Sequence, residues 1–146
     1  MSKDLADIGS RPATICTDST PVAQVARMMG EHSIGAVVVV NDESHLVGIV
    51  TDRDLALRIV GRELGPETPV SEAMTQEVAT VLNTASSLDA ARQMATRDCR
   101  RLPVVDAAGE VIAVLSLDDL YRAESAVLEQ IDRVLAVERA PRRKRS

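Results

Sequence analysis

The chain has 146 residues, of which 45% are hydrophobic, so it is long enough to bury the core of one compact domain. Aromatic residues make up 1% of the chain, and the formal net charge is −5. These values argue against stacking recognition of single-stranded nucleic acid, which needs aromatic platforms, and against binding of the main body to DNA or an acidic membrane.

The first ten residues are mostly polar. Residues 1–4 carry no apolar signal-peptide core, and no apolar run in the chain reaches the length of a membrane span, so we expect a cytoplasmic protein. Leu5 and Ile8 predict one turn of helix that lies on a neighbouring unit, and Arg11-Pro12 ends this turn.

The next fifty residues predict a small unit of strands and helices. Residues 13–16 predict a short strand, and residues 21–31 predict a capped amphipathic helix. Two apolar strands at 34–40 and 46–50 follow. The polar turn 41–45 between them is short enough to make the pair a hairpin.

Residues 48–55 change from a strand pattern to a helix pattern. Thr51 and Asp52 stand where N-capping residues belong, so the turn presents free backbone N–H groups beside a hydroxyl. Arg53 and Asp54 add a guanidinium and a carboxylate. Such a corner suits a sugar phosphate, because helix N-termini attract anions and a carboxylate accepts hydrogen bonds from ribose hydroxyls.

Residues 113–120 repeat the pattern of 48–55 at an offset of 65, keeping the hydroxyl as Ser116 and the acid as Asp119. The first strand of the hairpin recurs at the same offset. The amphipathic helix matches best at an offset of 66, which predicts a one-residue loop difference. One unit of this size has little core of its own, so we expect the two copies to bury their faces together.

The second unit follows a linker at residues 63–69. Its pattern predicts a strand at 78–82, a helix at 88–96 and a hairpin that turns at 107–110. The order of strand, helix, strand, strand and helix is therefore the same in both units.

The last helix is longer than its counterpart in the first unit. From Leu117 it is predicted to continue to about Arg139, with an apolar stripe at three- and four-residue spacing. The stripe comprises Leu120, Ala123, Val127, Leu128, Ile131, Val134 and Leu135. The stripe needs a partner surface: it either folds back across the module or pairs with a second subunit, and we favour a homodimer. The arginine- and lysine-rich residues that follow predict a disordered tail, and nucleic-acid contact by this tail is the lesser alternative.

These features resemble a tandem pair of cystathionine-β-synthase (CBS) domains, called a Bateman module. The resemblance rests on two copies of the pattern glycine or alanine, two apolar residues, Ser or Thr, two variable residues, Asp and an apolar residue. It also rests on Leu102-Pro103-Val104-Val105-Asp106 and on the Ala73-Met74-Thr75 entry to the second unit.

The resemblance implies an α/β (α+β) fold. Two βαββα units would be related by a pseudo-two-fold axis and packed through their sheets, with an extended C-terminal helix. We expect CBS unit 1 at 4–65, CBS unit 2 at 70–123, the C-terminal helix extension at 124–138 and a disordered basic tail at 139–146.

In CBS pairs, two clefts between the units commonly hold AMP, ADP, ATP or S-adenosylmethionine. By this resemblance Asp54 would accept hydrogen bonds from the ribose of one cleft, with Thr51 and Arg53 toward the phosphate. The base would lie against Thr75, Val78 and Thr80.

In the other cleft the same resemblance assigns the ribose to Asp119 and the phosphate to Ser116, with Thr14 near the base. Arg100 and Arg101 would reach into this cleft.

The two corners differ at two positions. Asp118 stands where the first corner has Arg53 and would repel a phosphate, and Ala113 replaces Gly48. We therefore rank the Asp54 cleft above the Asp119 cleft.

The same residues also have a purely structural interpretation. Thr51 and Ser116 would cap helices, Asp54 and Asp119 would complement helix dipoles, and the arginines would form surface ion pairs. The alternative function is then a dimeric interaction scaffold with vestigial clefts, whose C-terminal helix and basic tail recruit a partner. A DNA-linked regulator would need a further domain, because no helix-turn-helix pattern is present.

We expect a regulatory protein without a required cofactor rather than an enzyme. The chain shows no Ser-His-Asp or Cys-His arrangement and no Walker-type loop, and His32 and His45 lack paired metal ligands. Cys16 and Cys99 are expected to be small buried residues, with a regulatory disulfide as the lesser alternative. A ligand that bridges both units would favour the arrangement that brings them together and so signal to an effector.

Overall fold

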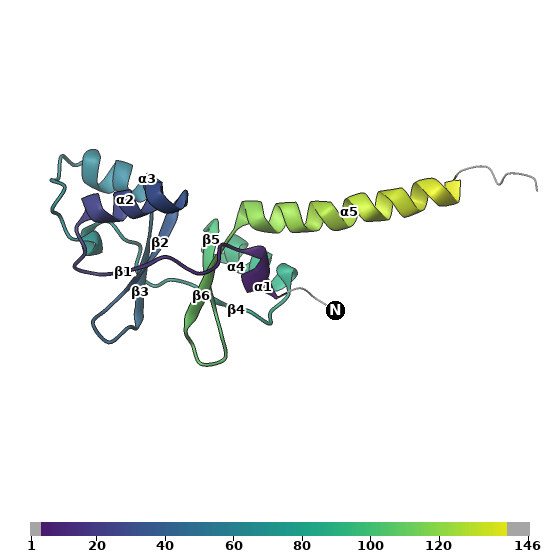
Figure 1. The fold of residues 1–146 in the computed structure, drawn as a ribbon, viewed down its shortest axis with the longest axis horizontal. Coiled ribbons are helices and arrows are strands. Elements are labelled where there is room, and N and C mark those ends of the chain that lie inside the picture. Colours follow the sequence, from purple (N-terminus) through teal and green to yellow (C-terminus); the bar gives the residue numbers. More distant parts are fainter. Residues whose placement is uncertain (1–3, 140–146) are drawn as a thin grey trace, which may run out of the picture.

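The computed structural model describes residues 4–139, which fold into two units of the same order after the short helix α1 (Leu5–Ile8) (Figure 1). The first unit consists of β1 (Ile15–Thr17), α2 (Val22–His32), β2 (Ala36–Val40), β3 (Leu46–Thr51), the single α-turn α3 (Asp52–Asp54) and the π-helical segment η1 (Leu55–Val60). The 3-10 helix η2 (Val70–Glu72) precedes the second unit, which consists of β4 (Val81–Leu82), α4 (Ser87–Arg97), β5 (Arg101–Val105), β6 (Val111–Ser116) and α5 (Leu117–Arg139). The predicted mixed fold of two strand–helix–strand–strand–helix units is confirmed.

Each unit contains one three-stranded sheet. In the first sheet β1 runs parallel to β2, and β2 runs antiparallel to β3. The second sheet repeats this arrangement with β4, β5 and β6. Both predicted hairpins are present. In the first turn the side chain of Asn41 accepts hydrogen bonds from two backbone N–H groups, and in the second turn the side chain of Asp106 does the same.

Helices α2 and α4 match at an offset of 65, so the predicted one-residue shift between the two units is wrong. Both helices have 11 residues, and each ends on a residue in the left-handed conformation, Ser33 (φ 52) and Asp98 (φ 50). The buried side chains are Val22, Val25 and Met29 in α2, and Ala90 and Met94 in α4. Met29, one position beyond Met28, is the counterpart of Met94.

Each unit completes its core with an entry helix that comes from outside its own strands. Leu5 of α1 is fully buried in the core of the second unit, together with Leu102 and Leu115. Val70 of η2 is fully buried in the core of the first unit, beside Val25. The prediction that the N-terminal turn lies on a neighbouring unit is therefore confirmed.

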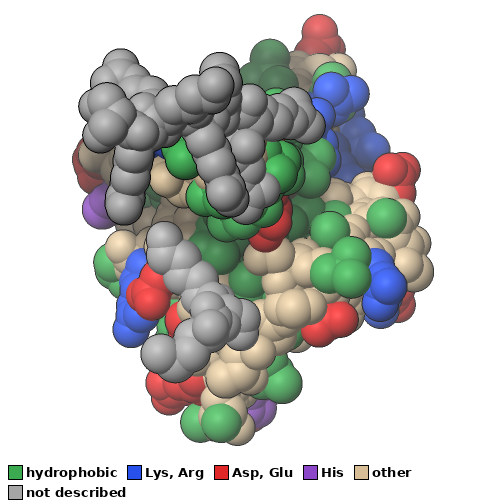
Figure 2. Space-filling view, turned by 90° about the vertical axis from the view of Figure 1, so that its right-hand side faces the viewer, with side chains coloured by type: hydrophobic (Ala, Val, Ile, Leu, Met, Phe, Trp, Pro, Cys, Tyr) green, Lys and Arg blue, Asp and Glu red, His purple; other side chains and the backbone are tan. Residues whose placement is uncertain are grey.

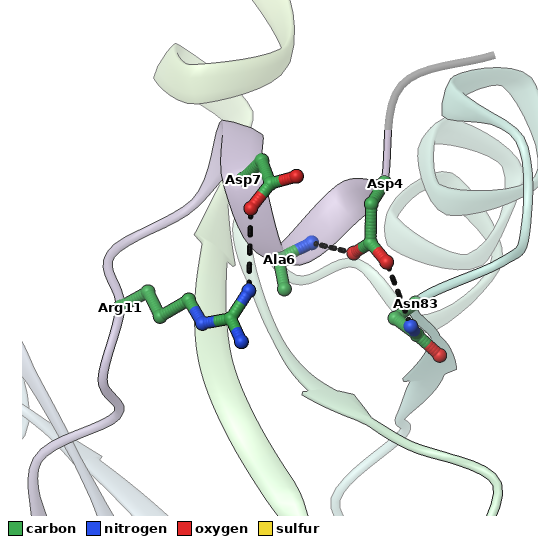
Figure 3. A network of polar contacts seen from close by, with 5 residues as sticks. All are labelled: Asp4, Ala6, Asp7, Arg11 and Asn83. Carbon is green, nitrogen blue, oxygen red and sulfur yellow. Dashed lines mark hydrogen bonds and ion pairs between the residues drawn. The ribbon is translucent and has the colours of Figure 1, made fainter. Parts of the chain in front are cut away.

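Helix α1 is held on the second unit by polar contacts as well (Figure 3). The carboxylate of Asp4 accepts from the N–H of Ala6 at 2.8 Å and from the side-chain amide of Asn83 at 2.7 Å. The first contact caps the helix and the second joins residues 79 positions apart. Arg11 donates to Asp7 at 3.2 Å on the exposed side of the same turn.

The two units pack through their sheets. Val38, Ile49 and Val114, from β2, β3 and β6, are buried in a third apolar cluster between the units. Two short antiparallel bridges cross the boundary: Ile49 pairs with Thr75, and Val114 pairs with Ser10. The bridges are also 65 positions apart, as the predicted pseudo-two-fold relation requires.

Three elements start or wind differently from the prediction, and one of them is β4, which begins at Val81 rather than Val78. Strand β1 begins at Ile15 rather than Ala13, because the N–H of Ala13 donates to the carbonyl of Ile112 in the other unit. The helix after Thr51 becomes π-helical, and the N–H of Gly61 donates to Ala56, five residues earlier.

Helix α5 extends from Leu117 to Arg139, as predicted, and projects away from the two units (Figure 1). Figure 2 views the molecule from this end and shows hydrophobic side chains at the surface among charged ones. The predicted basic tail, apart from Arg139, lies outside the described residues.

Candidate functional site

The two strand-to-helix corners have the same hydrogen-bonded geometry. The hydroxyl of Thr51 accepts from the N–H of Asp54 at 3.1 Å, and the carboxylate of Asp54 accepts from the N–H of Thr51 at 2.9 Å. Ser116 and Asp119 repeat this exchange at 3.0 and 2.8 Å. Each corner is therefore a capping box, and the structural role considered for these residues is present at both corners.

Each capping box leaves one carboxylate oxygen that can accept a further hydrogen bond. In both boxes the carboxylate oxygen Oδ2 accepts the hydrogen bond from the backbone N–H, so Oδ1 remains for another donor. Oδ1 of Asp119 lies 3.9 Å from Nη1 of Arg122, whose side chain is 77% exposed, whereas that of Asp119 is 19% exposed. A hydroxyl that reaches Oδ1 of Asp119 would thus meet a carboxylate partly shielded from water.

The Asp119 corner opens into a cavity of about 160 Å³ between the units. Three segments line the cavity: the chain before β1, the turn between α2 and β2, and the ends of β5, β6 and α5. The lining residues are Ser10, Pro12, Ala13, Thr14, Ser33, Ile34, Gly35, Ala36, Arg101, Val114, Ser116 and Asp119. Four of the predicted ligand residues, Thr14, Arg101, Ser116 and Asp119, therefore lie at one cavity.

Arg101 supplies a cation to this cavity from the first residue of β5. Its guanidinium lies against Gly35 of the other unit, since a Cβ on Gly35 would stand 2.8 Å from Nη2 of Arg101. The Asp52 carboxylate approaches the same position to 3.4 Å. Because Gly35 has no side chain, there is space for the guanidinium of one unit to reach the backbone of the other.

The remaining predicted residues lie around the first corner or on the surface. Thr75 is joined to β3 by two backbone hydrogen bonds with Ile49, at 2.8 and 3.1 Å, and its side chain is exposed. Val78 packs against the apolar cluster between the units, and Thr80 is partly buried directly before β4. The remaining two, Arg53 and Arg100, are exposed.

Arg58 holds the segment that enters the first corner. Its Nη1 donates to the carbonyl oxygens of Ala73 at 3.1 Å and Met74 at 3.0 Å, directly before Thr75. The sequence reasoning did not select Arg58, because nothing in its local pattern indicates a partner fifteen residues away.

The turn between α2 and β2 was also missed as part of the cavity. Residues 33–36 stand 65 positions before 98–101, which include the two arginines assigned to the cleft. The internal repeat therefore indicates that Gly35 and Ala36 lie at a cleft, although neither residue has a polar side chain.

Comparison with known proteins places this geometry in a family. The CBS-domain family model matches residues 5–61 and 70–126, and so covers both units. The chain belongs to the CBS-domain family. It is a tandem CBS pair, and the two corners are the equivalent strand-to-helix turns of its two CBS domains.

Individual relatives agree with this assignment. The CBS domain-containing protein YhcV of Bacillus subtilis is 37% identical over 108 residues, which cover 74% of this chain and 75% of that protein. A CBS-domain protein from Burkholderia ambifaria superposes with a TM-score of 0.72 at 33% identity, covering 83% of this chain and 93% of that structure. CBSX2, solved in complex with AMP, superposes with a TM-score of 0.68 at 27% identity, covering 86% of this chain and 98% of that structure.

Three further features of the described residues concern membrane-spanning helices, metal-ligand clusters and the two cysteines. Within residues 4–139, no helix has the length and apolarity to cross a membrane, and no three His, Cys, Asp or Glu side chains gather as metal ligands. Cys16 and Cys99 are free thiols. Burial raises the pKa of the Cys16 thiol to about 11, and burial also raises that of Cys99.

Proposed function

We propose that this CBS pair is a regulatory module that binds an adenine nucleotide or a related adenosyl ligand between its two units. The supporting observation is the cavity at which Thr14 of the first unit meets Arg101, Ser116 and Asp119 of the second. The relative CBSX2, which was solved with AMP, supports the ligand class. We propose a regulatory rather than a catalytic role.

Each side chain at the cavity has a role suited to one part of a nucleotide. Oδ1 of Asp119 would accept hydrogen bonds from the ribose hydroxyls, and the hydroxyl of Ser116 would donate a hydrogen bond to the phosphate. Arg101 would pair with the phosphate, and Thr14 would lie near the base.

The size and charge of the cavity favour a small ligand. Its volume of about 160 Å³ is small beside the ~300–1,000 Å³ of most ligand pockets. One guanidinium at the cavity matches one phosphate. AMP is therefore the preferred candidate among AMP, ADP, ATP and S-adenosylmethionine.

Our proposal starts from the Asp119 cleft, whereas the sequence ranking placed the Asp54 cleft first. Arg53, which favoured the Asp54 cleft, is exposed, and Asp118, which counted against the other cleft, is exposed too. Arg101 brings the cation to the Asp119 cleft instead.

The proposed mechanism is linkage between ligand binding and the arrangement of the units. The lining comes from both units, so a bound nucleotide would stabilise the arrangement in which the turn before Ala36 stays close to Ser116. The ligand can shift this equilibrium only by the difference between its affinities for the two arrangements.

Isothermal titration of the full chain with AMP, ADP, ATP and S-adenosylmethionine tests the proposal. We expect a heat of binding when AMP is titrated into wild type and into Asp54→Ala, and no heat of binding with Asp119→Ala. The reverse result for the two variants would move the site to the Asp54 cleft. Absence of heat with all four ligands at millimolar concentration would contradict nucleotide binding altogether.

A second candidate function is a homodimeric interaction scaffold. The exposed apolar side chains of α5, such as Leu128 at 60% and Ile131 at 47% exposure, favour it. Deletion of residues 139–146 discriminates between the two functions. If the deletion abolishes binding of a partner protein and leaves AMP binding unchanged, the scaffold is favoured. Unchanged partner binding would count against a role for the tail.

A further inference from the structure

The carboxylate of Asp52 lies close to the guanidinium of Arg101 at the boundary between the two units. A Cβ on Gly35 would stand 2.8 Å from Nη2 of Arg101 and 3.4 Å from Oδ2 of Asp52, so these two atoms are at most about 6 Å apart. No ion pair within residues 4–139 involves either side chain. The two opposite charges therefore attract each other without being in contact.

Local hydrogen bonds place Asp52 beside the cavity and leave one of its oxygens available. The N–H of Asp52 donates to the carbonyl of Gly35 at 3.1 Å, so the start of α3 lies next to the turn that lines the cavity. Oδ1 of Asp52 accepts from the N–H of Arg53 at 2.9 Å. Oδ2, the oxygen near Arg101, is therefore the one that can interact with a guanidinium.

The fold of the corner does not require this pair of charges. At the matching positions 65 residues away, Leu117 corresponds to Asp52 and Ala36 to Arg101, and both are apolar. The N–H of Leu117 nevertheless donates to the carbonyl of Arg100 at 2.8 Å, as that of Asp52 does to Gly35. The backbone of the corner thus forms without an acid at this position, and the charge of Asp52 is specific to the cavity at Arg101.

We infer that Asp52 is a positioning residue that acts through Arg101 and sets the affinity of the cavity for a phosphate group. Without a ligand, Asp52 attracts the guanidinium toward Gly35, at the edge of the cavity. A bound phosphate competes with Asp52 for the same guanidinium. The inference rests on the proposed nucleotide site and deepens it, because it concerns the part of the ligand that carries the charge.

The competition affects AMP and adenosine differently. The negative charge of Asp52 weakens the binding of a phosphate, both by attracting Arg101 and by direct repulsion. Adenosine has no phosphate, and its proposed contacts with Asp119 and Thr14 do not involve Arg101. A difference between the two ligands therefore separates an effect on the phosphate from damage to the cavity wall.

Isothermal titration of the full chain with AMP and adenosine tests the inference. Asp52→Asn should bind AMP about two- to fivefold more tightly than wild type at low salt, and the gain should shrink at high salt. Adenosine should bind both proteins equally. Asparagine keeps a side-chain oxygen that can accept from the N–H of Arg53, so the start of α3 should be preserved. Unchanged or weaker AMP binding, or an equal gain for adenosine, would overturn the inference.

Three further variants test the role of the charge. Asp52→Glu restores the carboxylate and should bind AMP nearly as wild type does. Asp42→Asn removes the same charge from an exposed residue in the turn before β3, roughly 20 Å from the corner that follows this strand, and should leave AMP affinity unchanged. In Arg101→Gln, the additional change Asp52→Asn should give a smaller gain. An equal gain from Asp42→Asn, or an undiminished gain without Arg101, would overturn the inference.

NMR spectroscopy with inorganic phosphate keeps this inference separate from nucleotide binding. The side-chain Nε–H signal of Arg101, assigned by its absence from Arg101→Gln, reports on the guanidinium. Asp52→Asn should shift this signal in the free protein, whereas Asp42→Asn should not. Phosphate should then move the signal at lower concentration in Asp52→Asn than in wild type.

The two readouts distinguish the possible failures. If the signal responds in this way but AMP gives no heat with wild type or Asp52→Asn, the nucleotide proposal fails and the inference about Asp52 stands. If AMP binds but the Arg101 signal is the same in wild type and Asp52→Asn, the inference fails and the nucleotide proposal stands.

Discussion

The side chain of Met74 lies directly on Gly48: a Cβ on Gly48 would stand 2.5 Å from the sulfur of Met74 and 3.0 Å from the carbonyl oxygen of Thr75. At the matching positions of the other unit, 65 residues away, Gly9 corresponds to Met74 and Ala113 to Gly48. The first pair thus combines glycine with methionine, whereas both residues of the second pair are small. The contact with Met74 gives a packing reason for glycine at position 48, where the second corner has Ala113.

This contact predicts that Gly48→Ala destabilises the protein by ~1–3 kcal/mol, because the new methyl group overpacks against Met74 and the backbone at Thr75. Urea denaturation measures the change. Gly30→Ala is the matched control, since nothing lies within 4 Å of its Cβ position in α2, and it should be neutral or stabilising. If Gly48→Ala/Met74→Ala costs as much as the sum of the two single changes, the proposed contact is not the cause.

Arg101→Ala should weaken AMP binding by about tenfold to a hundredfold, because a charge-assisted hydrogen bond to the phosphate contributes ~1.5–3 kcal/mol. Adenosine, which lacks the phosphate, should bind wild type and Arg101→Ala equally. Arg100→Ala is the neighbouring control, since Arg100 is exposed and does not line the cavity. Equal losses for AMP and adenosine in titration calorimetry would mean that Arg101 supports the cavity wall rather than the phosphate.

Ser116→Ala should lower the stability of the protein by ~1 kcal/mol, because the N–H of Asp119 loses its hydroxyl acceptor. Ser116→Thr keeps the acceptor and reproduces the residue at the first corner, Thr51, so it should remain close to wild type. Thermal unfolding followed by circular dichroism measures both. A threonine variant as unstable as the alanine variant would show that the cap is not the relevant interaction.

The Cys16 thiol should resist modification in the folded protein. Burial raises its pKa from the ordinary 9.0 to about 11, so about one thiol in a thousand is ionised at pH 8. A disulfide reagent at pH 8 should therefore react first with the partly exposed Cys99 and reach Cys16 only after unfolding. Cys99→Ser should remove the early reaction, and an early reaction that Cys16→Ser removes would contradict the assignment.

The same pKa has a consequence for stability. Because the folded state holds the proton of Cys16 more tightly than the unfolded state, its contribution is complete below pH 9 and declines as the pH rises toward 11. Urea denaturation between these pH values should show a decline that is smaller in Cys16→Ala.

Much of this molecule could be predicted from local pattern. The hydroxyl and acid three residues apart predict the capping boxes at Thr51 and Ser116, and apolar periodicity predicts α5 to its last residue. These features depend on neighbours within one or two helical turns or on alternation along one strand. The 65-residue repeat predicts two equivalent units for the same reason, since it is a property of the chain itself.

Contacts between the units were decided by tertiary structure. Leu5 completes the core of the second unit and Val70 that of the first, and Arg101 reaches Gly35 across the boundary. Each contact joins residues that lie far apart in the chain and meet only after both units have folded. For that reason the sequence by itself determined where the corners lie, whereas the packing of the units decided that a cavity opens beside Asp119.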